Sequence, residues 1–152
     1  RNAFVQGIGD DLTPLHVPPQ WLAVLKPAAG LETAKIFSHP ELRRATPPAI
    51  VAGFLADAAQ PGFWQQGFGH NDLQPVAEML CPEVAQAAQW LQRHFGNSRM
   101  TGSGSAVFAR SGLIQGTGDQ PSATFPAEAL PPGWVGRMCR SLVEHPLKSW
   151  AV

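Results

Sequence analysis

The clearest strand signal in the sequence is an uninterrupted apolar run at residues 21–25, bounded by prolines at 18, 19 and 27. Short apolar runs with such borders are typical of strands that are buried on both faces or packed against helices. We therefore predict a core strand here. A further run at 134–140 predicts the last strand of the chain.

Two segments before residue 81 have the spacing of helices. A Thr-Pro-Pro sequence at 46–48 provides a helix start, and apolar residues follow it at positions 50, 51, 54 and 55. Asp72 is expected to cap a second helix, because Pro75 then lies in the first turn, where no N–H is needed. Asn71 and Asp72 are accordingly interpreted as a structural cap.

Residues 82–95 give the strongest helix prediction. Arg93 and His94 suit the negative end of the helix dipole, and Gly96 fits the position just beyond a helix. The stripe expected to be buried consists of Val84, Ala87, Ala88, Leu91 and Phe95.

Beyond residue 98 the apolar residues recur at a shorter spacing than in a helix. Segments 99–101 and 105–109 are predicted to be two strands joined by the turn Gly102-Ser103-Gly104. Residues 111–133 are rich in Gly and Pro, which predicts loop with at most a short helix near 127–130. Together these elements predict an α+β domain in which an antiparallel sheet is covered by helices on one face.

Composition narrows the possible functions. The 152 residues suit a single domain, and eleven basic residues balance eleven acidic ones, so no cationic field favours nucleic acid or anionic lipid. The apolar runs are too short to cross a bilayer. The two cysteines are far apart and the five histidines are scattered, which predicts neither a disulfide framework nor a metal site. Reduced thiols favour a cytoplasmic location.

The glycine turn is the best candidate for chemistry. Gly102, Ser103 and Gly104 could let main-chain N–H groups approach a phosphate, or they could simply form a hairpin turn. The turn is neither a Walker A motif nor a complete G-x-G-x-x-G, because Val107 replaces the last glycine. Phe37 leaves a similar choice, between a core side chain and one that faces a cleft.

Four stretches in a fixed order carry a resemblance to a known family. They are residues 3–9 with 12–14, 33–42 with 46–47, 71–76, and 100–109, and the chain also closes similarly at 133–135 and 145–147. Taken together they resemble the C-terminal domain of the GHMP kinase superfamily. Within it they are most similar to the kinases that phosphorylate 4-diphosphocytidyl-2-C-methyl-D-erythritol.

The resemblance implies a small-molecule kinase of non-mevalonate isoprenoid synthesis, which transfers the γ-phosphoryl group of ATP to the 2-hydroxyl of that substrate. By the family pattern, Phe37 stacks on the cytosine ring and Thr33 lies beside the substrate phosphates. Gly102, Ser103 and Gly104 correspond to the third superfamily motif. The sequence departs from the pattern where Glu32 and Ala34 flank Thr33, and at 111–131, where Gly- and Pro-rich chain replaces a helix.

The resemblance also implies a missing partner. The family's ATP-binding loop and catalytic groups precede the position of Arg1, so residues 1–152 are expected to be the C-terminal domain without its N-terminal ATP-binding domain. The chain alone is then expected to contain no catalytic residue, to be inactive, and to bind no cofactor. The complete enzyme would use ATP and Mg²⁺. The surface that meets the missing domain would be open, which predicts self-association.

Two alternatives remain open from the sequence. One is a GHMP kinase with a different small-molecule acceptor. The other is a non-catalytic binding or assembly domain that kept the same architecture, since a fold alone does not fix a function.

Overall fold

The computed structural model describes residues 2–47, 69–114, 120–121 and 123–144, and the structural statements below concern these residues. The helix expected behind the Thr-Pro-Pro sequence at 46–48 lies almost entirely outside them. The expected similarity at 145–147 lies outside them as well.

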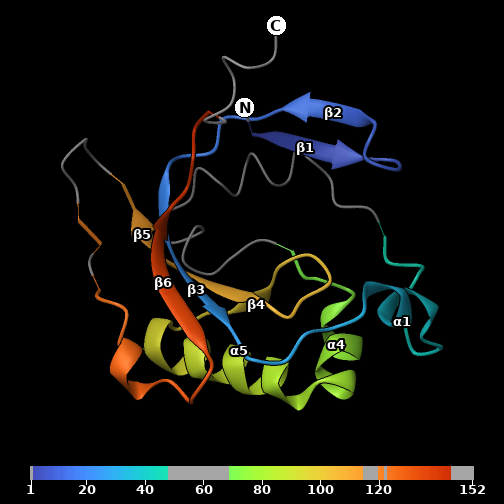
Figure 1. The fold of residues 1–152 in the computed structure, drawn as a ribbon. Coiled ribbons are helices and arrows are strands. Elements are labelled where there is room, and N and C mark those ends of the chain that lie inside the picture. Colours follow the sequence, from blue (N-terminus) through green and yellow to red (C-terminus); the bar gives the residue numbers. More distant parts are fainter. Residues whose placement is uncertain (1, 48–68, 115–119, 122, 145–152) are drawn as a thin grey trace, which may run out of the picture.

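A four-stranded antiparallel sheet forms the centre of the domain (Figure 1). Its strand order is β4 (Arg99–Met100), β5 (Val107–Leu113), β3 (Gln20–Lys26) and β6 (Val135–Arg140). The apolar run at 21–25 therefore lies in the inner strand β3, which pairs with both β5 and β6. The predicted core strand at 21–25 and the predicted last strand at 134–140 are confirmed as β3 and β6.

The two faces of β3 are covered to different extents. Ala23 and Leu25 are completely buried, whereas Leu22 and Val24, which point to the other face, are partly buried. Apolar residues at consecutive positions suit an inner strand, because side chains on the less enclosed face still pack against those of both neighbouring strands. Of the two burial patterns expected from the unbroken run, the structure shows the second, in which one face of the strand packs against a helix.

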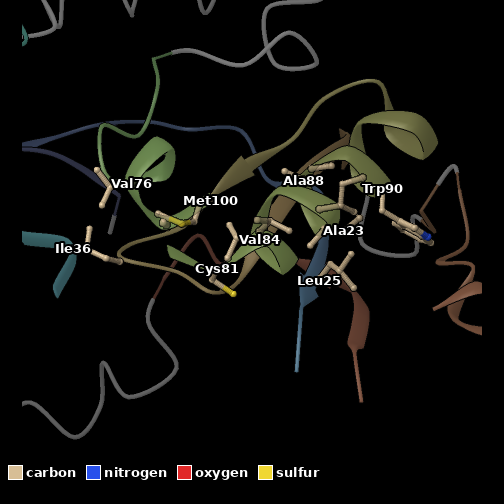
Figure 2. Close-up of a cluster of buried hydrophobic side chains, with 14 of the residues drawn as sticks. Ala23, Leu25, Ile36, Val76, Cys81, Val84, Ala88, Trp90 and Met100 are labelled. Carbon is tan, nitrogen blue, oxygen red and sulfur yellow. The ribbon is translucent and has the colours of Figure 1, made fainter. Parts of the chain in front are cut away.

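Helix α5 (Pro82–Phe95) lies across one face of the sheet (Figure 1). Val84, Ala87 and Leu91 are fully buried on it, and each buried Val or Leu contributes about 1.5–3 kcal/mol to stability. Gly96 ends the helix with a φ of 74°, as predicted. Figure 2 shows how this helix, β3 and Met100 of β4 share one apolar core.

Helix α4 (Gln74–Leu80) precedes α5, and its start differs from the prediction. Asp72 does not cap the helix: its Oδ1 lies 2.8 Å from Nε2 of His70. Asn71 makes the local turn instead, because its Oδ1 accepts a hydrogen bond from the Leu73 N–H at 3.0 Å. Pro75 lies in the first turn, as expected.

The predicted hairpin is present as β4 and β5, with a longer turn than expected. Residue 105 belongs to the turn, and β5 starts at Val107 and continues to Leu113. The Thr101 N–H donates to the carbonyl of Ala106 at 3.0 Å, and this bond closes the turn. A single 3-10 turn, η1 (Ala127–Ala129), lies where a short helix was predicted.

A second hairpin, formed by β1 (Ala3–Gln6) and β2 (Asp11–Pro14), was not predicted from the pattern. Its strands are short and do not alternate clearly between apolar and polar residues. Gly7 and Gly9, with φ angles of 63° and 102°, are the local signal that could have identified the turn. Val5 and Leu12 face each other across this hairpin and are both exposed.

We predict that Gly136→Ala destabilises the domain. An added Cβ would collide with the Phe125 ring, which packs against Trp90 at a centroid distance of 5.3 Å. The free energy of unfolding, measured by denaturant titration, is expected to fall by about 1–3 kcal/mol. The control is Gly30→Ala, where nothing lies within 4 Å of the added atom. Equal midpoints for the two variants would contradict this packing.

Candidate functional site

The structure brings Thr33 and Ser103 together, although they are 70 residues apart in the sequence. Thr33 is the first residue of α1 (Thr33–Ser38), and Ser103 is in the turn between β4 and β5. The two hydroxyl oxygens lie 2.8 Å apart and share a hydrogen bond. The predicted site residues on the helix and on the glycine turn therefore adjoin one another.

Phe37 is not part of the hydrophobic core. Its side chain is 55% exposed, while the neighbouring Ile36 is completely buried and anchors α1. Phe37 follows Thr33 by four residues, which places both on the same face of the helix. Of the two interpretations left open by the sequence, the structure contradicts the core side chain, while a cleft-facing ring stays a prediction.

The end of α1 is fixed by a residue that the sequence did not single out. The Arg44 guanidinium donates to the carbonyl of Phe37 and, at 3.2 Å, to that of Leu42. A cation at a helix C-terminus satisfies open carbonyl groups and opposes the negative end of the dipole. Arg44 thereby fixes the backbone that carries Phe37.

The glycine turn depends on both of its glycines, for different reasons. Gly102 and Gly104 have φ angles of 55° and 88°, which side chains rarely tolerate. A Cβ on Gly104 would also lie 2.8 Å from the Met100 sulfur and 3.1 Å from a Leu31 methyl carbon. Around Gly102, by contrast, the space is open.

The main-chain amides of this turn differ in their availability. The Gly104 N–H donates to the Thr101 carbonyl at 3.1 Å, so it is occupied. The amides of Gly102 and Ser103 have no acceptor among the residues that the structure describes. Two neighbouring free N–H groups in a turn of this kind can bind an anion. The turn thus offers two donors rather than three.

Contacts on both sides hold the turn in place. The hydroxyl of Ser105 donates to the Ala29 carbonyl at 2.7 Å, and Gln74 Oε1 accepts from the Met100 N–H at 2.8 Å. Ser105 is almost fully buried. Sequence reasoning missed these residues because a lone Ser or Gln has no distinctive pattern.

The acidic residue beside Thr33 is neutralised locally. Glu32 Oε1 lies 2.6 Å from the Lys35 ammonium group, and both side chains are well exposed. An exposed pair of this kind contributes little to stability. It does reduce the repulsion that an isolated Glu32 carboxylate would exert on an anion near Thr33.

A cavity of about 490 Å³ is lined in part by Asn71, whose amide group also contacts the glycine turn. Arg43, Arg99, Glu41, Asp72 and Glu78 line it, so it contains charges of both signs. Burial lowers the pKa of Arg99, and burial together with the charge of Arg99 lowers that of Arg110. None of the predicted site residues lines this cavity.

Two further features were searched within the described part of the chain. No group of three or more His, Cys, Asp or Glu side chains there is placed to hold a metal ion. Of the helices in the same residues, none has the length and apolar character needed to cross a membrane.

Part of the chain matches a known protein family. Residues 48–112 match the family "GHMP kinases C terminal". This match covers less than half of the chain, and the mixed architecture of helices and antiparallel sheets is the fold expected from the resemblance.

Curated relatives match the chain along nearly its whole length. The chain is 50% identical, over 99% of its length, to 4-diphosphocytidyl-2-C-methyl-D-erythritol kinase of Methylibium petroleiphilum, of which it covers 49%. For the kinase of the same name from Variovorax paradoxus, the identity is 48%, over 99% of this chain and 51% of the relative. The chain thus spans about half the length of the curated relatives it matches.

A solved structure agrees with these sequence matches. The crystal structure of 4-(cytidine 5'-diphospho)-2C-methyl-D-erythritol kinase superposes on this domain with a TM-score of 0.53 and 29% identity. The match covers 72% of this chain and 39% of that chain.

We predict that the Thr33 and Ser103 hydroxyls are energetically coupled. Thr33→Val, Ser103→Ala and the double variant form a cycle whose coupling free energy of unfolding should be about 0.5–1.5 kcal/mol, the usual net value of one hydrogen bond. Denaturant titration of all four proteins measures it. A coupling of zero would show that the two hydroxyls do not connect α1 to the glycine turn.

Proposed function

We propose that the chain forms the substrate-side part of a kinase that transfers the γ-phosphoryl group of ATP to the 2-hydroxyl of 4-diphosphocytidyl-2-C-methyl-D-erythritol. The observation that carries the proposal is the 2.8 Å contact between Thr33 and Ser103. It places the exposed aromatic ring of α1 and the free amides of the glycine turn on adjoining segments. A cytidine diphosphate needs both an aromatic surface for its base and hydrogen-bond donors for its phosphates.

Each part of the proposed site has a separate role. Phe37 stacks on the cytosine ring, as exposed aromatic side chains do with single bases. The amides of Gly102 and Ser103 donate to phosphate oxygens, and Gly104 allows the turn to pack closely on Met100. The Thr33 hydroxyl contributes one more polar group beside the phosphates.

The binding energy available from this chain alone is small. One base stack contributes about 1–3 kcal/mol and a favourable backbone dipole about 0.3–1 kcal/mol, whereas micromolar affinity needs about 8 kcal/mol. The proposed kinase therefore requires its N-terminal domain for ATP and for the catalytic groups, and residues 1–152 act as its C-terminal domain. By itself the chain is inactive, without bound cofactor.

We also propose that the complete kinase acts in the cytoplasm and uses Mg²⁺ together with ATP. Bound with ATP, Mg²⁺ would neutralise charge on the transferred phosphoryl group. Among the described residues, no group of three or more His, Cys, Asp or Glu side chains is placed to hold a metal ion. In the proposal, this chain therefore orients the acceptor and its phosphates.

Assay of the complete kinase, in which this chain is joined to its N-terminal half, tests the function. Turnover of ATP with the cytidylated acceptor supports the proposal. Turnover only with a different small-molecule acceptor would select another GHMP kinase. No turnover with any acceptor would select a non-catalytic binding or assembly domain.

The exposed apolar residues of the β1–β2 hairpin support the further proposal that the chain self-associates when its partner domain is absent. Ile8 is 97% exposed, and Val5 and Leu12 are more than half exposed. Sedimentation velocity of the chain alone, over a wide range of concentration, should show species larger than a monomer. A single monomeric species throughout would contradict this.

We predict that Phe37→Ala in the complete kinase raises KM for the cytidylated substrate by about 5- to 150-fold, which corresponds to the loss of one base stack. KM for ATP should remain nearly unchanged. Steady-state kinetics measure both constants. Met79→Ala is the matched control, because Met79 is also 55% exposed but lies on α4. Equal losses for both ligands would contradict the stacking role.

We predict that Gly102→Val in the complete kinase suppresses kcat by about tenfold or more, because a β-branched residue at a φ of 55° distorts the turn and its donors. Gly96→Val is the control, since Gly96 combines a positive φ of 74° with open space around its Cα. Gly96→Val therefore introduces a comparable backbone strain at a site outside the glycine turn. Similar kcat values for the two variants would make the turn an ordinary hairpin.

A further inference from the structure

Asn71 makes three hydrogen bonds that connect the start of α4 to the glycine turn. Its Nδ2 donates to the carbonyl of Met100 at 3.0 Å and to that of Gly102 at 2.8 Å. Its Oδ1 accepts from the Leu73 N–H at 3.0 Å. The carboxamide therefore uses both of its donor hydrogens on a segment about 30 residues away.

The bond to Gly102 determines the direction of a neighbouring donor. The carbonyl of Gly102 and the N–H of Ser103 belong to the same planar peptide group, in which a trans linkage points them in opposite directions. Asn71 holds the carbonyl toward α4, so the Ser103 N–H must point away from α4. That N–H is one of the two amides in the turn without an acceptor among the described residues.

The same contact also makes the amide a better donor. A carbonyl that accepts a hydrogen bond polarises its peptide group, which strengthens the hydrogen bond that the N–H can make. The bond from Asn71 to the Met100 carbonyl acts in the same way on the peptide group between Met100 and Thr101, whose N–H closes the turn on Ala106. One side chain thus fixes both the shape of the turn and the orientation of its donor.

From these contacts we infer that Asn71 is a positioning residue for anion binding: it holds the Ser103 amide in the orientation that receives a phosphate oxygen. The phosphate would belong to a nucleoside diphosphate or to ATP, and this assignment of the anion rests on the proposed kinase function. Asn71 does not touch the ligand itself. It acts through the peptide group between Gly102 and Ser103.

The neighbouring acidic residue provides a matched comparison. The Asp72 carboxylate is paired with His70 at 2.8 Å and makes no hydrogen bond to the turn. Asn71→Asp keeps the size of the side chain and the oxygen that accepts from Leu73. It replaces the two donated hydrogen bonds by a carboxylate oxygen facing two carbonyl groups. Asp72→Asn makes the reverse change one residue away.

The first experiment measures hydrogen exchange of the backbone amides at 101–106 and in α5, in the complete protein. In Asn71→Asp, the hydrogen-bonded turn amides of Thr101 and Gly104 should exchange about tenfold faster or more, with α5 unchanged, because only local bonds are lost. Asp72→Asn should match the wild type. Unchanged exchange in the turn, or equal acceleration in α5, would overturn the inference, since Asn71 would then be dispensable for the turn or would merely support the whole fold.

The second experiment compares kinetic constants of the complete kinase. Asn71→Asp should raise KM by about tenfold or more for the ligand whose phosphate the Ser103 amide receives, either the cytidylated substrate or ATP, and should change KM for the other ligand less than about threefold. Unchanged KM values for both ligands would overturn the positioning role. If the wild-type enzyme does not turn over this acceptor, the proposed function fails, and the exchange experiment still decides the role of Asn71.

Discussion

The packing of α5 against β3 and β5 determines the positions of the other elements. Val84, Ala87 and Leu91 are completely buried in this contact, and the small alanine side chain lets the helix approach the strands closely. Helix α4 is separated from α5 only by Cys81, so fixing α5 also limits where α4 can lie. The start of α4 is thereby directed to the hairpin of β4 and β5.

The glycine turn combines left-handed backbone conformations, which glycine adopts without strain, with supports on two sides. A turn with two positive φ angles would be poorly ordered in isolation, since glycine loses much conformational freedom on folding. Asn71 and Gln74 hold it from α4, while Thr33 and Ala29 hold it from the segment around α1. The free amides are consequently oriented before any ligand arrives, which reduces the entropy cost of binding.

The proposed division of the site between two domains accounts for candidate binding groups without an evident reactive centre among the described residues. Phosphoryl transfer depends mainly on positioning and on neutralising charge. The described residues offer an aromatic ring, two amides and a hydroxyl, which can position a nucleotide but cannot supply a base. This agrees with a chain that spans about half the length of its kinase relatives. It also places the proposed chemistry at the boundary with another domain.

The sequence by itself determined the elements whose signals are local. The apolar run of β3, the stripe and glycine cap of α5, and the turn between β4 and β5 follow from patterns within about fifteen residues, and the family resemblance followed from the order of several such motifs. Only the tertiary structure decided the exposure of Phe37, the contact between Thr33 and Ser103, and the role of Asn71 in place of Asp72. These depend on hydrogen bonds and burial between segments 29 to 70 residues apart. A side chain's immediate neighbours in sequence do not determine which distant backbone group it meets, so local patterns could not predict them.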